Sequence, residues 1–440
     1  MIKKNYICYE CNTKYTKWLG KCINCLQWNK ILEYKSSYYK NTLNKIIDIS
    51  TINLNKVNKI SSKFEEFDRV LGGGFIPGST ILLGGNPGTG KSTLFLQIAN
   101  KLIIQNLKVL YITGEETLLQ LAFRANRLFI NKGIKLLQET SVTKIIDIIE
   151  CNPMDIVIID SIQTMIVENI NKYLTGGVIQ IRQSAYILIN FAKKKGIVLL
   201  LIGHVIKDGN LAGPKLLEHM IDVSLMLETN QDYRMLRSTK NRFGSINELG
   251  IFKMLESGMK EVKDPSSIFI SQNKENTPGN VVMIILEGTR PILVEIQALV
   301  EEHNKLINYK MISVGIDINR LSLLITILNK YTGLFIGNIF INVVGGIKII
   351  ETSADLAVLA VIISSLHNRY IPMEFVILGE VGLNGEIRPI INIENRLLEA
   401  IKHGFTKAII PKNNIKSNFD FKKITIFCIE KISELLKIIL

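Results

Sequence analysis

Eight consecutive residues, 85 to 92, have the types and the spacing that bind a phosphate chain. They fit the pattern G-x-x-x-x-G-K-[ST]. The glycines let the backbone curl so that successive N–H groups point at one anion; Lys91 can reach the β- and γ-phosphates, and the Ser92 hydroxyl can ligate Mg²⁺. This pattern fits ATP or GTP equally well. The predicted nucleotide-binding residues are Gly85, Asn86, Pro87, Gly88, Thr89, Gly90, Lys91, Ser92 and Thr93.

Acidic residues stand at the ends of two strand-like apolar runs. Asp160 closes the run 155–160, where its carboxylate can hold the water shell of Mg²⁺. Glu115 and Glu116 follow the run 109–113, and a carboxylate there can orient and deprotonate an attacking water. We expect Glu115 to be this base. Glu116 is the second choice. The alternative role for one of the two is that of a helix N-terminal acid that complements the helix dipole.

Strand-like and helix-like stretches alternate around these residues. The strand-like stretches 80–84, 109–113, 155–160 and 197–204 are nearly continuous apolar runs, and expected helices cover 92–105, 118–128 and 178–195. This pattern is typical of a parallel sheet covered by helices on both faces, with ligands at the carboxyl ends of the strands. His204 ends the last run and has two open interpretations: it senses the γ-phosphate, or it packs and caps.

Four of the six cysteines form the pattern C-x₂-C-x₁₀-C-x₂-C; they are Cys8, Cys11, Cys22 and Cys25. Two such turns place four thiolates around one metal, a tetrahedral set that suits Zn²⁺ and keeps no open coordination position. A segment of about 35 residues buries too little core to fold alone, so metal binding would supply its folding energy. We therefore expect structural zinc. Iron is the minor alternative, and two disulfides would conflict with a cytosolic chain.

The composition limits which binding partners and which cellular compartment we expect for this protein. The chain has 440 residues, a formal net charge of +14 and a pI of about 9.3. This charge favours an anionic partner such as nucleic acid. Ile, Lys and Asn are used heavily throughout the chain, however, as an AT-rich genome would produce, and this raises the lysine content without any functional reason. No apolar run reaches the ~18–20 residues of a membrane span, and no secretory signal precedes the cysteines. We expect a cytoplasmic protein with no membrane partner.

Changes in composition and in hydrophobic pattern along the sequence divide the chain into four parts. We expect a zinc-binding module over 1–35, a polar linker over 36–60, a nucleotide-binding domain over 61–265 and a second α/β domain over 266–440.

Several further motifs, taken in order, carry a family resemblance. They are the four-cysteine module, Leu71-Gly72-Gly73-Gly74, Gly84-Gly85-Asn86-Pro87-Gly88, Thr113-Gly114-Glu115-Glu116, Gly203-His204-Val205, Lys207-Asp208-Gly209, Leu211-Ala212-Gly213-Pro214-Lys215 and Lys240-Asn241-Arg242-Phe243-Gly244. With these motifs the chain resembles the RecA-type ATPases and, more specifically, the bacterial RadA (Sms) family of DNA-repair proteins. The resemblance runs from the cysteines to near the C-terminus.

The resemblance implies a RecA-like P-loop ATPase core that uses ATP and Mg²⁺ and assembles into a homo-oligomeric, hexameric ring. It also implies that Lys240 and Arg242 couple ATP to DNA across a subunit boundary. From the residues alone, these two cations suit a phosphate reached in trans, a DNA backbone or a solvated turn. In RecA-like rings the loops after the later strands face DNA; here they are 164–178 and 205–219. Their basic residues are Lys172, Lys207 and Lys215.

The C-terminal part resembles the proteolytic domain of Lon, which uses a serine–lysine dyad. Ser353, in Thr352-Ser353-Ala354-Asp355, falls at the place of the nucleophile. An ungapped count from Gly385-Glu386-Ile387-Arg388-Pro389 puts Glu394 where the lysine should stand. Without an amine base the serine is not activated, so we interpret Ser353 as a helix N-cap, with Asp355 in the first turn. We expect a non-proteolytic scaffold domain.

The leading functional hypothesis is a DNA-dependent ATPase motor that drives single-stranded DNA through the ring. The resemblance implies action on branched recombination intermediates together with the RecA recombinase. Two alternatives remain: a DNA-binding scaffold whose assembly ATP switches without translocation, and an ATP-dependent protease of the Lon type.

Overall fold

The computed structural model describes residues 5–8, 13–15, 17–34, 48, 59–130, 133–168, 177–204, 217–271, 275–302, 310–334, 336–415 and 423–440. Two compact units make up the chain, residues 1–57 and 58–440. The first unit contains a three-stranded antiparallel sheet of order β2-β1-β3, formed by β1 (Asn5–Cys8), β2 (Lys14–Tyr15) and β3 (Ile31–Tyr34). Cys22 and Ile31 are buried at its centre.

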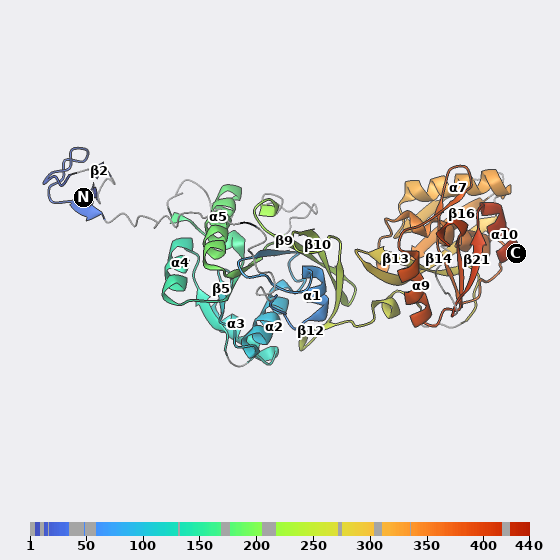
Figure 1. Ribbon diagram of the computed structural model, residues 1–440, viewed down its shortest axis with the longest axis horizontal. Helices are drawn as coiled ribbons and strands as arrows, with labels where there is room; N and C mark the ends of the chain where they lie inside the picture. Colours follow the sequence, from blue (N-terminus) through green and yellow to red (C-terminus); the bar gives the residue numbers. More distant parts are fainter. Residues whose placement is uncertain are drawn as a thin grey trace. The chain divides into compact units, whose positions relative to one another are not determined.

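The second unit begins with a nine-stranded sheet of order β12-β11-β10-β9-β4-β8-β7-β5-β6 (Figure 1). The six strands from β9 to β6 are parallel, and β10, β11 and β12 extend the sheet antiparallel. We call this part, residues 59–261, the P-loop domain. Its strands are β4 (Thr80–Gly84), β5 (Val109–Thr113), β6 (Lys135–Gln138), β7 (Ile156–Asp160), β8 (Val198–Ile202), β9 (Val223–Asn230), β10 (Tyr233–Asn241), β11 (Leu249–Leu255) and β12 (Gly258–Glu261).

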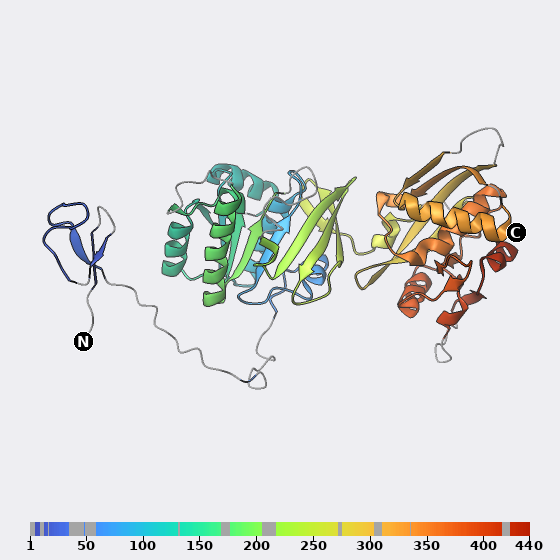
Figure 2. The same cartoon turned by 90° about the horizontal axis from the view of Figure 1, so that it is seen from above.

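Helices cover both faces of this sheet, because the central strands are apolar on both sides. Figure 1 shows helices on either side of the sheet, and Figure 2 shows the same domain from above. The helices are α1 (Glu65–Leu71), α2 (Lys91–Ile104), α3 (Leu118–Arg127), α4 (Val142–Cys151) and α5 (Val178–Lys195). Alternate residues of β7 enter different cores: Ile156 and Ile158 pack with α1, α2 and α3, whereas Val157 and Ile159 pack with α4 and α5. The predicted doubly covered parallel sheet is therefore confirmed.

A second sheet, of order β15-β16-β14-β13-β17-β20-β21, organises residues 265–440, which we call the C-terminal domain. Helix α8 (Asp355–Leu366) is buried over almost its whole length and contacts β13 and β14. The other strands and helices of this domain are β13 (Asn280–Glu287), β14 (Arg290–Glu302), β15 (Met311–Val314), β16 (Ile336–Val343), β17 (Phe375–Ile377), β18 (Glu380–Val381), β19 (Ile387–Arg388), β20 (Lys407–Pro411), β21 (Thr425–Ile429), α7 (Ile318–Thr332), α9 (Ile393–Lys402) and α10 (Ile432–Ile439).

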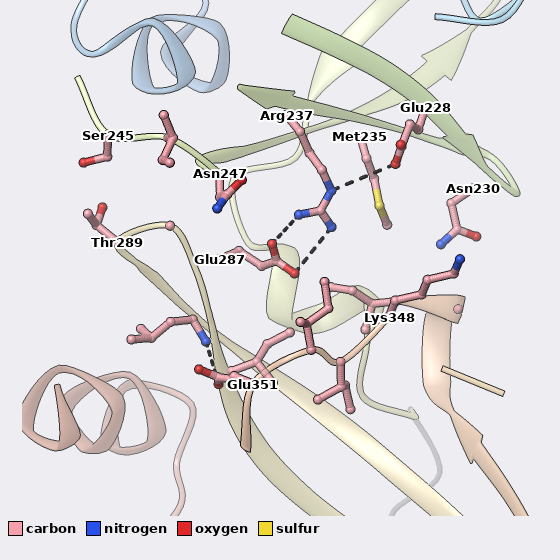
Figure 3. Close-up of a pocket in the computed structure, with 18 of the residues that line it drawn as sticks. Glu228, Asn230, Met235, Arg237, Ser245, Asn247, Glu287, Thr289, Lys348 and Glu351 are labelled. Carbon is pink, nitrogen blue, oxygen red and sulfur yellow. Dashed lines mark hydrogen bonds and ion pairs between the residues drawn. The ribbon is translucent and has the colours of Figure 1, made fainter. Parts of the chain in front are cut away.

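The turn between β13 and β14 contacts the P-loop domain through charged side chains. Arg290 donates two hydrogen bonds from Nη1 to the carboxylate of Glu66 on α1, at 2.9 and 3.0 Å. Arg237 on β10 pairs with Glu287 beside a pocket of about 1080 Å³ (Figure 3). Because Glu66 is only 3% exposed, its pair with Arg290 is a buried link between the two domains.

Within the described part of the chain, every helix is too short or too polar to cross a lipid bilayer.

Candidate nucleotide-binding site

The predicted phosphate-binding loop connects β4 to α2, as its strand–loop–helix context predicts. Gly90 is the N-cap of α2 with a φ of 99°, a left-handed conformation that glycine adopts without strain. A Cβ at Gly85 would lie 2.5 Å from the carbonyl oxygen of Leu227 on β9, so a side chain there would collide with backbone. The loop therefore takes a conformation that its glycines permit, with the N-terminus of α2 at its end, a place suited to an anion.

Lys91 lies at the start of α2 and is 4% exposed. Its Nζ donates to the carbonyl oxygens of Gly85 at 2.8 Å and of Asn86 at 2.9 Å. Burial lowers the pKa of Lys91, and the charges of Asp160 and Glu115 oppose that shift. The ammonium thus lies inside the phosphate-binding loop, within the electrostatic reach of both predicted carboxylates.

Asp160 ends β7 and is 7% exposed. Its Oδ2 accepts a hydrogen bond of 2.6 Å from the phenol of Tyr111 on the neighbouring strand β5. Thr113 and Asp160 are partners in the β5–β7 register, so the ends of the two strands lie side by side. The parallel pairing therefore brings Asp160 to the same sheet edge as the residues that follow β5.

Glu115 and Glu116 differ in their partners. Glu115 accepts a hydrogen bond from the Ser161 hydroxyl, and its Oε1 lies 3.3 Å from His204 Nε2. The hydrogen bond with His204 lowers the pKa of Glu115, and burial acts against this. Glu116 instead forms an ion pair with Arg124 of α3. Glu115 is therefore the carboxylate that joins the cluster of Lys91, Asp160 and His204.

Lys240 and Arg242 lie at the other end of the sheet. Arg242 Nη1 is 3.2 Å from Oδ1 of Asp222, and Asp222 Oδ2 accepts from the amide of Thr80, the first residue of β4. Lys240 Nζ donates to the carbonyl of Glu218, and burial lowers the pKa of this lysine. The phosphate-binding loop begins directly after the last residue of β4. It is therefore five residues, or roughly 16 Å along the strand, from Thr80. The two cations thus do not meet the loop of their own chain.

Three residues near the phosphate-binding loop were missed by sequence reasoning. Tyr111 and Ser161 contact the predicted carboxylates, and Arg234 Nε on β10 donates to the carbonyl oxygen of Thr89 at 3.1 Å. Tyr111 lies inside an apolar run, and Arg234 belongs to a strand far along the chain. Only the serine directly after Asp160 could have been noticed by its position.

Two of the four predicted zinc ligands can be located. Cys22 is buried, and its Sγ accepts from the amide of Cys25 at 3.5 Å, so both lie on one tight turn. Cys11 and the side chain of Cys8 lie outside the described residues, as do most of the predicted DNA-facing loops, including Lys172, Lys207 and Lys215.

The surroundings of Ser353 differ from the prediction. Ala354, not Ser353, is the N-cap of α8, and the Ser353 hydroxyl donates to Glu351 at 2.6 Å. Glu394 is exposed, and the cation beside the serine is Arg396, whose Nη1 lies 3.1 Å from Oγ. Arg396 is completely buried and pairs with both oxygens of Glu351. A guanidinium stays protonated in proteins, so it cannot act as the base of a serine dyad.

The sheet order, the loop between β4 and α2 and the carboxylates at the neighbouring strand ends together define a RecA-like P-loop ATPase. Comparisons with known proteins agree. The sequence model of the family described as "AAA domain" matches residues 50–210, and that of "Subunit ChlI of Mg-chelatase" matches residues 325–414.

Curated relatives extend the likeness over the whole chain. "DNA repair protein RadA" of Haemophilus influenzae is 46% identical, with 99% of this chain and 98% of the relative covered. The protein of the same name from Escherichia coli is 45% identical over the same shares. The chain therefore belongs to the RadA family of DNA repair proteins. Among solved structures, a KaiC-like protein of Pyrococcus horikoshii OT3 is 20% identical in sequence and gives a TM-score of 0.40. The match covers 47% of this chain and 99% of the KaiC-like chain.

Proposed function

We propose that this protein is a DNA-dependent ATPase motor of homologous recombination and repair, working in the cytoplasm. It would move single-stranded DNA and process branched intermediates together with the RecA recombinase. One observation carries the proposal. Lys91, Asp160 and Glu115 converge at the carboxyl ends of the parallel strands, whereas Lys240 and Arg242 lie near the opposite ends of these strands. The relatives are named as DNA repair proteins, which supports the choice of DNA as the partner.

The residues present fit ATP and Mg²⁺. Lys91 now donates to carbonyls of its own loop, and these donors can turn to the β- and γ-phosphates. Ser92 and Asp160 offer hydroxyl and carboxylate oxygens, the ligands that Mg²⁺ prefers. Bound Mg²⁺ would neutralise charge on the phosphates. Residues 85–93 would hold the nucleotide.

We propose that Glu115 acts as the base. Its lowered pKa keeps the carboxylate ionised at neutral pH, ready to accept a proton from water. The water oxygen would bond to the γ-phosphorus as the bond from that phosphorus to the β–γ bridging oxygen breaks, releasing ADP. His204 and Ser161 would hold Glu115 in the orientation that this step needs.

The placement of Lys240 and Arg242 supports a site that two subunits share. In a closed ring, one face of each subunit meets a different face of its neighbour. A cation roughly a strand length from its own loop can then reach the nucleotide of the next subunit. We propose that both residues act in this way within a hexamer, linking hydrolysis to DNA movement.

The four cysteines fit a structural zinc site. Cys22 and Cys25 lie on one tight turn, and Cys8 ends the central strand of the small sheet. Thiolates are the soft ligands that zinc prefers, and a small module with so little core gains its stability from such a metal. The module would contact DNA or the recombinase.

The C-terminal domain would act as a scaffold for the ring. Arg396 beside Ser353 argues against the protease alternative, because neither it nor Glu351 supplies the neutral amine that activates the serine of a dyad.

The decisive experiment measures ATP turnover with and without single-stranded DNA, together with unwinding of a forked duplex. The motor predicts DNA-stimulated turnover and unwinding, both lost in Lys91→Ala and both retained in the control Lys253→Ala, which removes an exposed lysine of β11. ATP-dependent DNA binding without unwinding or branch migration would favour the switched scaffold. Full activity of Lys91→Ala would refute the motor.

A further inference from the structure

Asp160, one of the two residues proposed to hold Mg²⁺, accepts a hydrogen bond from the phenol of Tyr111. We infer that Tyr111 is a positioning residue for the metal: its phenol fixes one oxygen of Asp160 and so keeps the carboxylate in a metal-binding arrangement. This inference rests on the proposed ATPase function and adds a residue that the nucleotide motifs do not contain.

The position of Tyr111 follows from the strand pairing. It lies two residues before Thr113, the end of β5, and β5 pairs in parallel with β7, which ends at Asp160. The side chain of Tyr111 belongs to the same core as Leu94 and Phe95 of α2, the helix that starts at Lys91. Tyr111 therefore lies on the side of the sheet that α2 covers. The phenol therefore approaches the Asp160 carboxylate from within the protein.

The contacts of the phenol are specific. Its O–H donates to Oδ2 of Asp160 at 2.6 Å, which leaves Oδ1 for a water of the metal shell. The phenol is therefore a direct donor to the carboxylate proposed for the metal.

A purely structural role would need only the ring. Tyr111 is completely buried in an apolar core, where phenylalanine would pack without a polar atom to satisfy. A buried hydroxyl is costly unless it is hydrogen-bonded, and its partner here is the carboxylate proposed for the metal. The hydroxyl, not the ring, is therefore the part to test.

The test is Tyr111→Phe in the full-length protein, with Mn²⁺ as the metal probe. Mn²⁺ binding to the ADP complex is measured by electron paramagnetic resonance of the free ion, and ADP binding is measured separately in EDTA. We expect Mn²⁺ to bind about 10–100-fold more weakly, the usual loss when an outer-shell partner is removed, while ADP binding without metal stays unchanged. Tyr370→Phe, which removes an exposed phenol of the C-terminal domain, is the matched control.

A double-mutant cycle separates positioning from packing. If Tyr111 acts through Asp160, Tyr111→Phe costs no further Mn²⁺ affinity in an Asp160→Asn background. Unchanged Mn²⁺ affinity of the single variant, or an additive loss in the cycle, overturns the inference. The proposed ATPase function fails separately, if the wild-type protein shows no metal-dependent ATP turnover.

A second measurement keeps the inference testable if Tyr111→Phe does not fold. 3-Fluorotyrosine incorporated at position 111 alone reports on the phenol by ¹⁹F NMR. Its resonance should shift when Mg²⁺ is added to the ADP complex, and an unmoved resonance overturns the inference.

Discussion

Glu115 and Glu116 are neighbours in the chain, but only one of them faces the nucleotide-binding loop. Glu115 contacts Ser161 and His204, whereas Glu116 pairs with Arg124, eight residues further on. From the sequence both fitted the role of the base, because both follow a buried strand. Tertiary contacts, which no local pattern encodes, separate them.

Substituting the two glutamates separately tests this assignment. Glu115→Gln should reduce kcat for ATP hydrolysis by about 100-fold or more, the typical share of a general base, with little change in ATP binding. Glu116→Gln is the matched control and should stay close to wild type. Steady-state kinetics with single-stranded DNA give both values, and equal losses in the two variants would refute the assignment.

The pH dependence of hydrolysis should depend on His204. The lowered pKa of Glu115 keeps the base ionised until the pH falls through that pKa, where activity is lost. Because the hydrogen bond with His204 is the largest cause of that lowering, His204→Ala should shift the acid limb of the kcat profile to higher pH. The measurement is kcat between pH 4 and 8, roughly the range over which an unperturbed carboxyl and histidine titrate. An acid limb that stays in place would show that His204 does not tune Glu115.

Ser353 should be dispensable for ATP chemistry. Its hydroxyl is engaged by Glu351 and Arg396, which hold it as part of a buried polar cluster. Ser353→Ala should leave ATPase and DNA activities intact. Peptide hydrolysis by the wild-type protein that disappears in this variant would restore the protease alternative.

Among the helices and strands, the bounds predicted from the sequence agree best with the structure where the element is long and buried. The strands Thr80–Gly84 and Val109–Thr113 and the helix Val178–Lys195 were predicted with the observed bounds, since long apolar runs and a long periodic helix carry strong signals. The shorter β6 and α4 were missed, because β6 is half-exposed and neither has a long apolar run.

The error at Arg396 has a geometric cause. Counting without gaps placed Glu394 beside Ser353, but residues two apart on a helix face different sides. In α9 the exposed side carries Glu394 and the buried side carries Arg396. A count along the chain could not foresee which side of this helix faces the serine.

Helix α1 joins several parts of the larger unit. Glu66 in its first turn accepts from Arg290 and from the amide of Ile251, and the carbonyl of Val70 near its end accepts from Asn241. Asn241 lies between Lys240 and Arg242 in the chain. One short helix therefore contacts both the C-terminal domain and the segment proposed to act on a neighbouring subunit.

Removing Arg290 should be costly. Arg290→Ala leaves the buried carboxylate of Glu66 with Arg69, 3.1 Å away, as its remaining cation. The loss of unfolding free energy should therefore stay below the about 3–5 kcal/mol that a fully unpaired buried charge costs. Urea unfolding measures the change. Arg388→Ala, which removes an exposed arginine paired with Glu386 on the surface, is the control and should change stability little. Equal effects of both substitutions would contradict the role assigned to burial.

For the whole molecule, a mixing experiment tests whether two subunits share the site. Lys91→Ala lacks the loop lysine and Arg242→Ala lacks the cation at the opposite edge, so each variant alone should be inactive. Mixed rings contain interfaces at which an intact loop meets an intact Arg242, and ATP turnover should partly recover. Turnover that stays at the level of the separate variants would show that each chain forms its site alone.

The separation of Lys91 from Lys240 and Arg242 along β4 also bears on how the protein behaves as its concentration changes. An active centre divided between two chains exists only while the chains are associated, so the fraction of working centres follows the law of mass action. The turnover per molecule should therefore fall on dilution and rise again on concentration. A cell could then limit this ATP consumption through protein abundance alone, because scarce, dispersed copies would be idle.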